Sequence, residues 1–274
     1  MGIRNHVISA LTLGSQPQSF LGARWIRPSL RLLPSSKSTE LALRYISMSP
    51  HYFYRTEKNA HLELRAFLQS ERDRNAQSRT AIIETVVLKY LQSDFVLLDY
   101  GCGPGFLAAA ASRRAAKVYA CDIADGILAC AEILNGAANI EYRAIPASGK
   151  IPIADASIDL VYSFAVIQHV TDEVFEKILR EWRRIVKPGG RVLCHIVLDD
   201  SGWKPEQEWR GDTSVNGKLK WYIGLHCFGR TRRNVEEQFV AAGLAFPEIV
   251  PISDFNLPYD DDICRQHLCV SSVL

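Results

Sequence analysis

The sequence predicts an α/β protein with a Rossmann-like, doubly wound parallel sheet. Residues 95–98 (FVLL) form a short apolar run between polar residues and glycine, which is typical of a parallel strand covered on both faces. Residues 106–116 follow as an alanine-rich stretch without a helix breaker, which predicts a helix. Strand-like and helix-like stretches continue to alternate beyond it, and such alternation builds a parallel sheet with helices on its faces.

Three glycines stand at alternate positions directly after the first strand. Gly101, Gly103 and Gly105 have no Cβ, so the backbone can turn tightly there and a ligand can approach the main chain. Asp122 follows a second predicted strand at 118–120. A carboxylate at this place can accept hydrogen bonds from the two hydroxyls of a ribose, as in mononucleotide-binding α/β units.

A dinucleotide ligand is less favoured than a mononucleotide. The dinucleotide fingerprint needs a third glycine at the position that Phe106 holds, where it allows close helix packing. A tight turn with Asp122 as a simple helix cap remains the structural alternative, and only further motifs can decide against it.

Those further motifs are present, and together they resemble a known family. Residues 98–105 (LDYGCGPG), followed by an acidic residue near the end of the next strand, resemble the first two motifs of class I S-adenosylmethionine-dependent methyltransferases, in the small-molecule branch of that superfamily. Residues 157–170 and 180–193 resemble the fourth-strand and fifth-strand segments of this family in order and spacing. The resemblance covers about residues 78–243.

The resemblance implies a fold, a cofactor and a set of site residues. The expected sheet has seven strands and is mostly parallel, with a final antiparallel hairpin at 246–252 and 267–273. The expected cofactor is S-adenosylmethionine as methyl donor. Asp99 is expected to order the loop and meet the amino group, Ile123 to flank the adenine, and the fourth-strand end to line the transfer channel. The implied cofactor-binding residues are Asp99, Gly101, Cys102, Gly103, Gly105, Asp122, Ile123, Ser163, Phe164 and Gln168.

Two features of the site are left open by the sequence. Relatives often carry an acidic residue that meets the adenine amino group, whereas Ala147 and Ser148 stand at that place here. His169 is the first candidate for a catalytic base, because imidazole titrates near neutrality and the residue follows the fourth strand. His226 is the second candidate, and a packing role is the alternative for His169.

Composition limits the class of protein and its partners. The formal charge of +2 hides a basic start, because the first fifty residues carry six basic and one acidic residue, which leaves 26 basic and 29 acidic residues for the rest. A body with this balance does not favour nucleic acid as a partner. Seven cysteines without a Cys-x-x-Cys pair indicate reduced thiols rather than disulfides or a metal site. No apolar run has the length of a membrane span, so a cytoplasmic location is expected.

Two segments are predicted to lie outside the methyltransferase core of residues 48–274. Residues 1–47 are basic at first and rich in serine and proline, which indicates a disordered leader or a targeting segment; a mitochondrial or plastid transit peptide, or a true start at Met48, are the alternatives. Folding is not expected to depend on this leader. Residues 199–229 form a long aromatic insert, which we expect to bind substrate.

Helices are further expected at 58–69 and 75–91. The aromatic residues 52–54 are expected to pack against the core, and the alternative that the resemblance implies is that they help cover the cofactor pocket. The sequence as a whole favours methyl transfer to an oxygen, nitrogen or carbon atom of a small-molecule acceptor. An RNA (tRNA included) or protein methyltransferase is the first alternative, and a binding protein that keeps the fold without catalysis is the second. The oligomeric state is not predicted.

Overall fold

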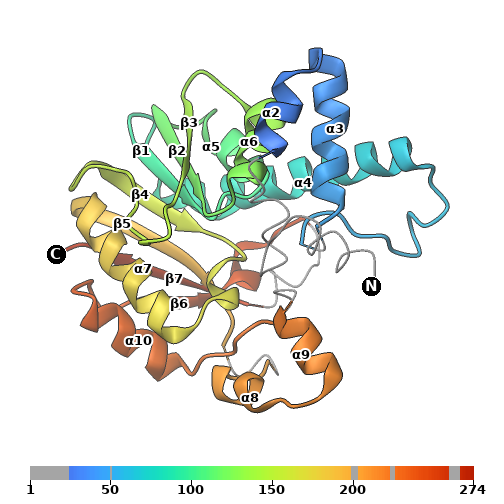
Figure 1. Ribbon diagram of the computed structural model, residues 1–274. Helices are drawn as coiled ribbons and strands as arrows, with labels where there is room; N and C mark the ends of the chain where they lie inside the picture. The colour runs from blue at the N-terminus through green and yellow to red at the C-terminus, as the bar shows by residue number, and fades with distance from the viewer. Residues whose placement is uncertain (1–24, 50, 199–202, 223–225, 259–265) are drawn as a thin grey trace.

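One seven-stranded sheet forms the centre of the molecule. The computed structural model describes residues 25–49, 51–198, 203–222, 226–258 and 266–274. The strands are ordered β3-β2-β1-β4-β5-β7-β6 (Figure 1). They are β1 (Val96–Tyr100), β2 (Lys117–Asp122), β3 (Ile140–Ala144), β4 (Ile158–Ser163), β5 (Val186–Ile196), β6 (Glu248–Pro251) and β7 (His267–Ser272). Strands β1 to β5 are parallel, and β7 runs antiparallel to both β5 and β6, which confirms the predicted sheet.

Helices cover both faces of the sheet. Helices α7 and α10 lie on one face, and α4 and α5 lie on the other (Figure 1). The helices are α2 (Ile26–Arg31), α3 (Ser35–Ser47), α4 (Leu64–Thr85), α5 (Phe106–Ala111), α6 (Asp125–Asn135), α7 (Asp172–Ile185), α8 (Glu206–Gly211), α9 (Val215–Tyr222) and α10 (Arg232–Ala241). Short 3₁₀ turns occur at η2 (Val87–Tyr90), η3 (Ile167–His169) and η5 (Ile252–Phe255).

The apolar runs of the central strands contribute side chains to the hydrophobic cores on both faces of the sheet. Leu97 packs with the α4 and α5 side of the sheet, whereas Leu98 packs with the α7 and α10 side. Consecutive side chains of a strand point to opposite faces, so an unbroken apolar run is what a strand between two helix layers needs. Asp159 fixes the start of this arrangement, because its carboxylate accepts a hydrogen bond of 2.8 Å from the Val96 amide and pairs with Lys187.

A threonine caps the start of each of two helices, α7 and α10. The Thr171 hydroxyl accepts a hydrogen bond from the Val174 amide at the start of α7, and the Thr231 hydroxyl accepts one from the Asn234 amide at the start of α10. These side chains satisfy amides that have no partner inside a helix.

Helix α4 differs from the sequence expectation. The two helices expected at 58–69 and 75–91 are wrong in their bounds: one continuous helix runs over Leu64–Thr85. The polar middle contains no helix breaker, and its Glu71 and Asn75 are buried. Glu71 accepts a hydrogen bond of 3.0 Å from the Tyr54 amide, and Asn75 donates one to the Tyr52 carbonyl. These side chains therefore hold the segment that precedes the helix.

The N-terminal region also differs from the expected leader. Helices α2 and α3 pack against α6, with Ile26, Leu30 and Ile46 almost completely buried. Arg27 bridges to Asp125 at 2.9 Å and to Glu132 at 2.7 Å, both on α6. Residues 26–47 are thus mostly helical, because their apolar side chains complete a core with α6. The division of the chain at residue 47 stays a prediction, and residues 1–24 lie outside the described residues.

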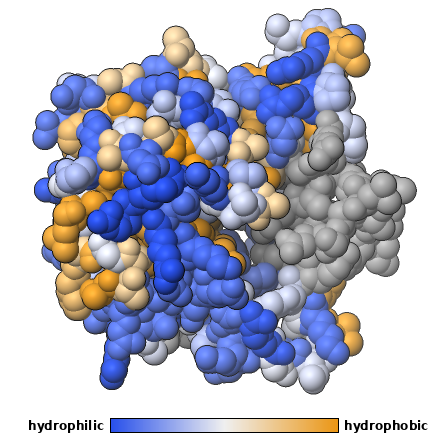
Figure 2. Space-filling model, turned by 60° about the vertical axis from the view of Figure 1, so that its left-hand side comes forward, coloured by the Kyte–Doolittle hydropathy of each residue, from blue (hydrophilic) through white to orange (hydrophobic). Residues whose placement is uncertain are grey.

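The expected insert contains two short helices, α8 and α9, which lie at the lower edge of the molecule in the view of Figure 1. Residues 199–202 and 223–225 of the insert lie outside the described residues. Within the described part of the chain, no helix is both long and apolar enough to cross a membrane. Figure 2 shows a face on which hydrophilic side chains predominate, with apolar side chains gathered along its left edge.

Candidate functional site

The glycine loop lies between β1 and α5, at the carboxyl edge of the sheet. Gly101, Gly103 and Gly105 have φ angles of 72°, 50° and 80°, a left-handed conformation that favours glycine. A Cβ at Gly101 would lie 2.3 Å from Val166, and one at Gly103 would lie 2.9 Å from Tyr52. The loop therefore requires glycine for its backbone and also for the side chains that pack on it.

The amides of this loop are engaged within the protein. Those of Gly101 and Cys102 donate to the Cys121 carbonyl at 2.8 and 3.0 Å, and the Gly105 amide donates to the Cys102 carbonyl. The Gly103 amide donates to Asp122. Hydrogen-bond donors of the loop are thus already used, which favours a ligand that brings its own donors, such as an amino group.

Asp122 is the last residue of β2 and faces this loop. Its two carboxylate oxygens accept hydrogen bonds of 3.0 Å, one from the Gly103 amide and one from the Ala124 amide. Burial raises the pKa of Asp122, and these two amides act in the opposite direction. Each oxygen keeps a second lone pair, so the carboxylate can still accept from hydroxyl groups. Ile123 beside it is 63% exposed, so its side chain is accessible to a ligand bound at this edge.

Asp99 lies in β1 beneath the loop and is almost completely buried. Its Oδ2 atom has no hydrogen-bond partner among the described residues. Burial raises the pKa of this carboxyl well above its usual range, and the charge of Asp122 raises it further. An unpaired buried carboxylate oxygen is costly, and a positively charged ligand group would relieve that cost.

The end of β4 places the remaining predicted cofactor residues. The Ser163 hydroxyl donates to the Tyr100 carbonyl at 3.0 Å, so this side chain ties β4 to β1 rather than presenting a free hydroxyl. Phe164 stacks on His195 with ring centroids 6.1 Å apart. Gln168 contacts the Cys227 sulfur at 3.7 Å. Cys102 is buried, and burial raises the pKa of its thiol, which keeps it neutral.

His169 and His226 join η3 to the insert. The His169 Nδ1 donates to the His226 carbonyl at 2.7 Å, and the His226 Nε2 donates to the His169 carbonyl at 3.2 Å. Burial and, to a smaller extent, the neighbouring His51 together lower the pKa of His169 to about 4. Such a ring is neutral at pH 7 but is a weak base, because a catalytic base works best with a pKa near the operating pH. These contacts favour a connecting role for both histidines, and their catalytic role stays a prediction.

His195 is a polar residue of this edge that sequence reasoning missed. It lies in β5, is 1% exposed, and its Nδ1 accepts a hydrogen bond of 3.1 Å from the Ala165 amide. The proton of the neutral ring therefore lies on Nε2, which has no hydrogen-bond partner among the described residues. Burial lowers the pKa of His195 to about 3, so the ring stays neutral. Ala165 itself has a φ of 57°, a strained conformation for alanine that aims its amide at the ring.

The signal for His195 was present in the sequence. A histidine interrupts the apolar run of a central strand close to its carboxyl end, where open parallel sheets place ligands.

Two other sequence-based expectations concern residues near the site. Tyr52 lies on Gly103, whereas Phe53 is buried with α2, α3 and α6. Ala147 and Ser148 lie in an exposed turn, so the adenine contact stays open.

The site fits the cofactor that the resemblance implies. Asp122 can meet a ribose, the exposed Ile123 can cover a base, and Asp99 can meet an ammonium group. Among the residues that the structure describes, no group of three His, Cys, Asp or Glu side chains is placed to hold a metal ion.

The chain is similar to known methyltransferases over part of its length. Residues 98–194, from β1 to β5, match the family model described as "Methyltransferase domain". The ubiquinone biosynthesis O-methyltransferase of Pseudomonas fluorescens (strain Pf0-1) is 36% identical over 103 residues, which are 37% of this chain and 44% of that protein. The corresponding protein of Pseudomonas aeruginosa (strain LESB58) is 34% identical over the same length. The chain thus spans less than half the length of these curated relatives.

Solved structures show the same fold at lower identity. The geranyl diphosphate C-methyltransferase of Streptomyces coelicolor A3(2), in complex with Mg²⁺, geranyl diphosphate and S-adenosylhomocysteine, has a TM-score of 0.52 and 16% identity, covering 88% of this chain and 99% of that chain. A Haemonchus contortus phosphoethanolamine N-methyltransferase in complex with S-adenosylhomocysteine has a TM-score of 0.51 and 19% identity, covering 71% of this chain and 52% of that chain.

Proposed function

The chain carries a class I S-adenosylmethionine-dependent methyltransferase domain, and from this premise we propose that it transfers the methyl group of S-adenosylmethionine to a small-molecule acceptor. The observation that carries the proposal is the placement of Asp122 at the end of β2, directly against the left-handed glycine loop. The cofactor of this family, when bound, supplies a methyl group on a positively charged sulfur.

The residues of the chain then have three tasks: to hold the cofactor, to align the acceptor and to exclude water. Alignment is the largest of these, because proximity and orientation can contribute roughly 7–11 kcal/mol. We assign the ribose to Asp122, the amino group to Asp99 and one face of the adenine to Ile123. Tyr52, which packs on Gly103, is placed to help exclude water from the loop.

The acceptor side of the proposal rests on His195 and on the insert. The Nε2 hydrogen of His195 is a buried donor without a partner among the described residues, beside the Phe164 ring that we expect to line the transfer channel. We assign it to a hydrogen bond with an oxygen or nitrogen atom of the acceptor. The lowered pKa makes His195 a permanent donor rather than a base.

A small molecule is favoured over RNA or protein as acceptor for two reasons. The similar Pseudomonas proteins are named for ubiquinone biosynthesis, a small-molecule pathway. The body of the chain also has more acidic than basic residues, which disfavours a polyanionic partner.

The cofactor part is tested by calorimetric titration of S-adenosylmethionine and S-adenosylhomocysteine. Asp122→Ala is expected to lower the affinity by roughly 10- to 100-fold, because it removes the acceptor of charge-assisted hydrogen bonds. Asp155→Asn is the matched control, since that carboxylate is exposed and lies outside the site. Unchanged affinity in the Asp122 variant, with an unchanged unfolding temperature, would refute the assignment.

The acceptor part is tested with methyl-labelled S-adenosylmethionine and separated pools of metabolites, RNA and protein. Label is expected in the metabolite pool. Label in RNA or protein alone would replace the proposal with the corresponding alternative, and cofactor binding without any transfer would favour a binding protein.

A further inference from the structure

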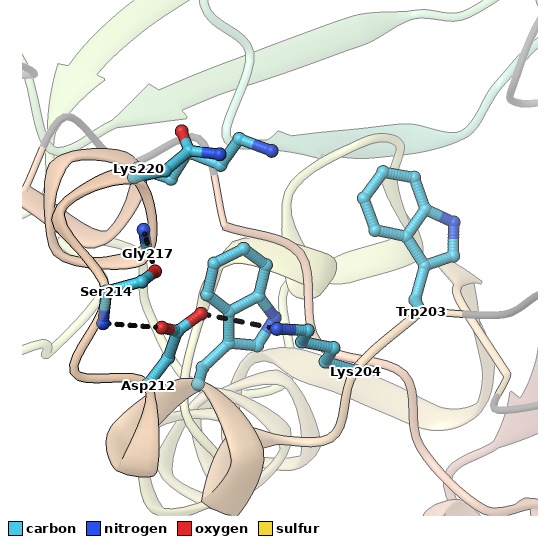
Figure 3. A pocket seen from close by; sticks show the side chains of 8 residues that line it. Trp203, Lys204, Asp212, Ser214, Gly217 and Lys220 are labelled. Atoms are coloured by element: carbon cyan, nitrogen blue, oxygen red, sulfur yellow. Dashed lines mark hydrogen bonds and ion pairs between the residues drawn. The ribbon is translucent and has the colours of Figure 1, made fainter.

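The insert carries an open cavity apart from the residues assigned to the cofactor. It has a volume of about 290 Å³ and lies between α8 and α9 (Figure 3). The residues that line it are Trp203, Lys204, Trp209, Asp212, Ser214, Asn216, Gly217 and Lys220. The volume is close to the lower end of the roughly 300–1,000 Å³ that small-molecule sites occupy, which leaves room for about one substituted ring.

Asp212 is a fixed part of the cavity wall. One carboxylate oxygen accepts a hydrogen bond of 2.9 Å from the Ser214 amide, and the other pairs with Lys204 at 3.2 Å. These donors lower the pKa of Asp212 to about 2, so it stays ionised. A Cβ at Gly217 would lie 2.3 Å from this carboxylate, so glycine lets α9 come close to it. Because both carboxylate oxygens of Asp212 already have donors in the protein, this residue is not expected to bind a cationic ligand.

Lys220 leaves the cavity with an excess of positive charge. Lys204 is balanced by Asp212, whereas Lys220 has no acidic partner among the described residues. In Figure 3 the side chain of Lys220 extends from α9 toward the side of the cavity that Trp203 forms. The cavity therefore favours an anion.

The two indoles give the cavity flat apolar walls. Trp209 is 8% exposed, and its Nε1 donates to the Cys227 carbonyl at 2.8 Å, which fixes the ring. Trp203 is half-buried at the other side. Indole faces bind other flat rings by offset or edge-to-face contact.

We propose that this cavity binds a small planar molecule that carries one anionic group, a carboxylate or a phosphate. Trp209 contacts Cys227, which in turn lies 3.8 Å from the His169 side chain, so the cavity wall is coupled to the segment after β4. The binding of this ligand does not depend on the proposed function.

The experiment is a titration of the full chain, without cofactor, followed by tryptophan fluorescence and calorimetry. The probes are benzoate, phenyl phosphate, benzyl alcohol and benzylamine, which share one ring and differ in charge. Both anions are expected to bind, and the ratio of their affinities identifies the preferred group. Lys220→Gln is expected to weaken anion binding roughly tenfold or more, since a charge-assisted hydrogen bond is lost. Lys218→Gln, two positions earlier on α9 and outside the lining, is the matched control and should change it less than twofold.

The outcomes separate this inference from the proposed function. Equal binding of benzylamine or benzyl alcohol, or equal anion affinity in the Lys220 variant and the wild type, would overturn the inference. Loss of anion binding in Lys220→Gln with an unchanged unfolding temperature would support it, even for a chain that binds no S-adenosylmethionine. The side chains of Lys204 and Lys220 are both exposed, so salt should screen their charges and weaken anion binding.

Discussion

His195 offers the sharpest test at the scale of single residues, because its two ring nitrogens have different tasks. Nδ1 accepts from the Ala165 amide, and Nε2 is the unpaired donor that we assign to the acceptor. The side-chain oxygen of asparagine can take the place of Nδ1 as acceptor, and the side-chain amide of glutamine can take the place of Nε2 as donor. His195→Asn is therefore expected to lower kcat/KM for the acceptor found in the labelling screen by roughly 10- to 100-fold, while His195→Gln lowers it less.

The control for this prediction is thermal stability, in which the two variants should rank in the opposite order to their activity. Asparagine keeps a partner for the Ala165 amide, so His195→Asn should unfold at a higher temperature than His195→Gln. Affinity for S-adenosylmethionine should stay within about twofold in both variants, since neither atom is assigned to the cofactor. A purely structural His195 would give the same order in activity as in stability.

Single residues of the site were predictable where the local sequence determines their geometry. Alternate glycines after a strand predicted the tight turn, and the position of Asp122 followed from its place at a strand end. The contact between Ala165 and His195 joins residues 30 positions apart, so its geometry depends on how β4 and β5 pair. The mutual bonds of His169 and His226 likewise depend on how the insert folds back.

At the scale of elements, a helix end has a clearer local signal in the sequence than the continuity of a helix. Thr171 and Thr231 cap their helices by accepting hydrogen bonds from amides three residues further along the chain. The local sequence can reveal contacts over such a short range. The middle of α4 reads as polar and exposed, yet Glu71 and Asn75 are buried because the preceding segment packs on them. Burial of this kind is decided by tertiary contacts and leaves no periodic signal.

Helices α2 and α3 lead to an element-scale prediction about truncation. A chain of residues 48–274 is expected to unfold at a temperature several degrees lower than the full chain, because α6 loses the cover of Ile26, Leu30 and Ile46. Burial of each large aliphatic side chain contributes about 1.5–3 kcal/mol. Thermal unfolding followed by circular dichroism measures the difference.

Arg27→Gln is the matched control for the truncation, because it removes the bridges to Asp125 and Glu132 but keeps the apolar contacts. Partly exposed ion pairs contribute about 0–1 kcal/mol, so its effect should be small. A truncated chain as stable as the full one would show that the N-terminal helices are dispensable, as the composition of the leader first suggested.

At the scale of the whole molecule, the alternation of apolar runs and helical stretches predicted a parallel sheet between helix layers, and the family resemblance implied its seven strands and its antiparallel hairpin. Parallel strands joined by crossover helices have few permitted arrangements, so the sheet could be predicted without its contacts. The mutual placement of α8, α9 and η3 could not, because it rests on side-chain contacts such as that of Trp209 with the Cys227 carbonyl.

Burial of histidines gives the whole molecule an expected dependence on pH. The pKa of His169 is lowered to about 4 and that of His195 to about 3, from an ordinary value near 6.5. Between the folded and unfolded values the unfolded chain binds more protons, so these two rings stabilise the fold fully above about pH 6.5 and progressively less as the pH falls toward 4. Asp99 and Asp122 act in the opposite direction, because burial raises the pKa of both carboxyls.

A variant that lacks both rings separates these contributions. The double variant His169→Gln and His195→Gln keeps the two carboxyls, so the free energy of unfolding of the wild type should fall more steeply than that of the variant between pH 6.5 and 4.5. Urea denaturation at a series of pH values measures both slopes. Because His51 and His226 also face His169, some dependence should remain in the variant. Equal slopes would mean that the two histidines are not held neutral by burial, and the permanent donor assigned to His195 would lose its basis.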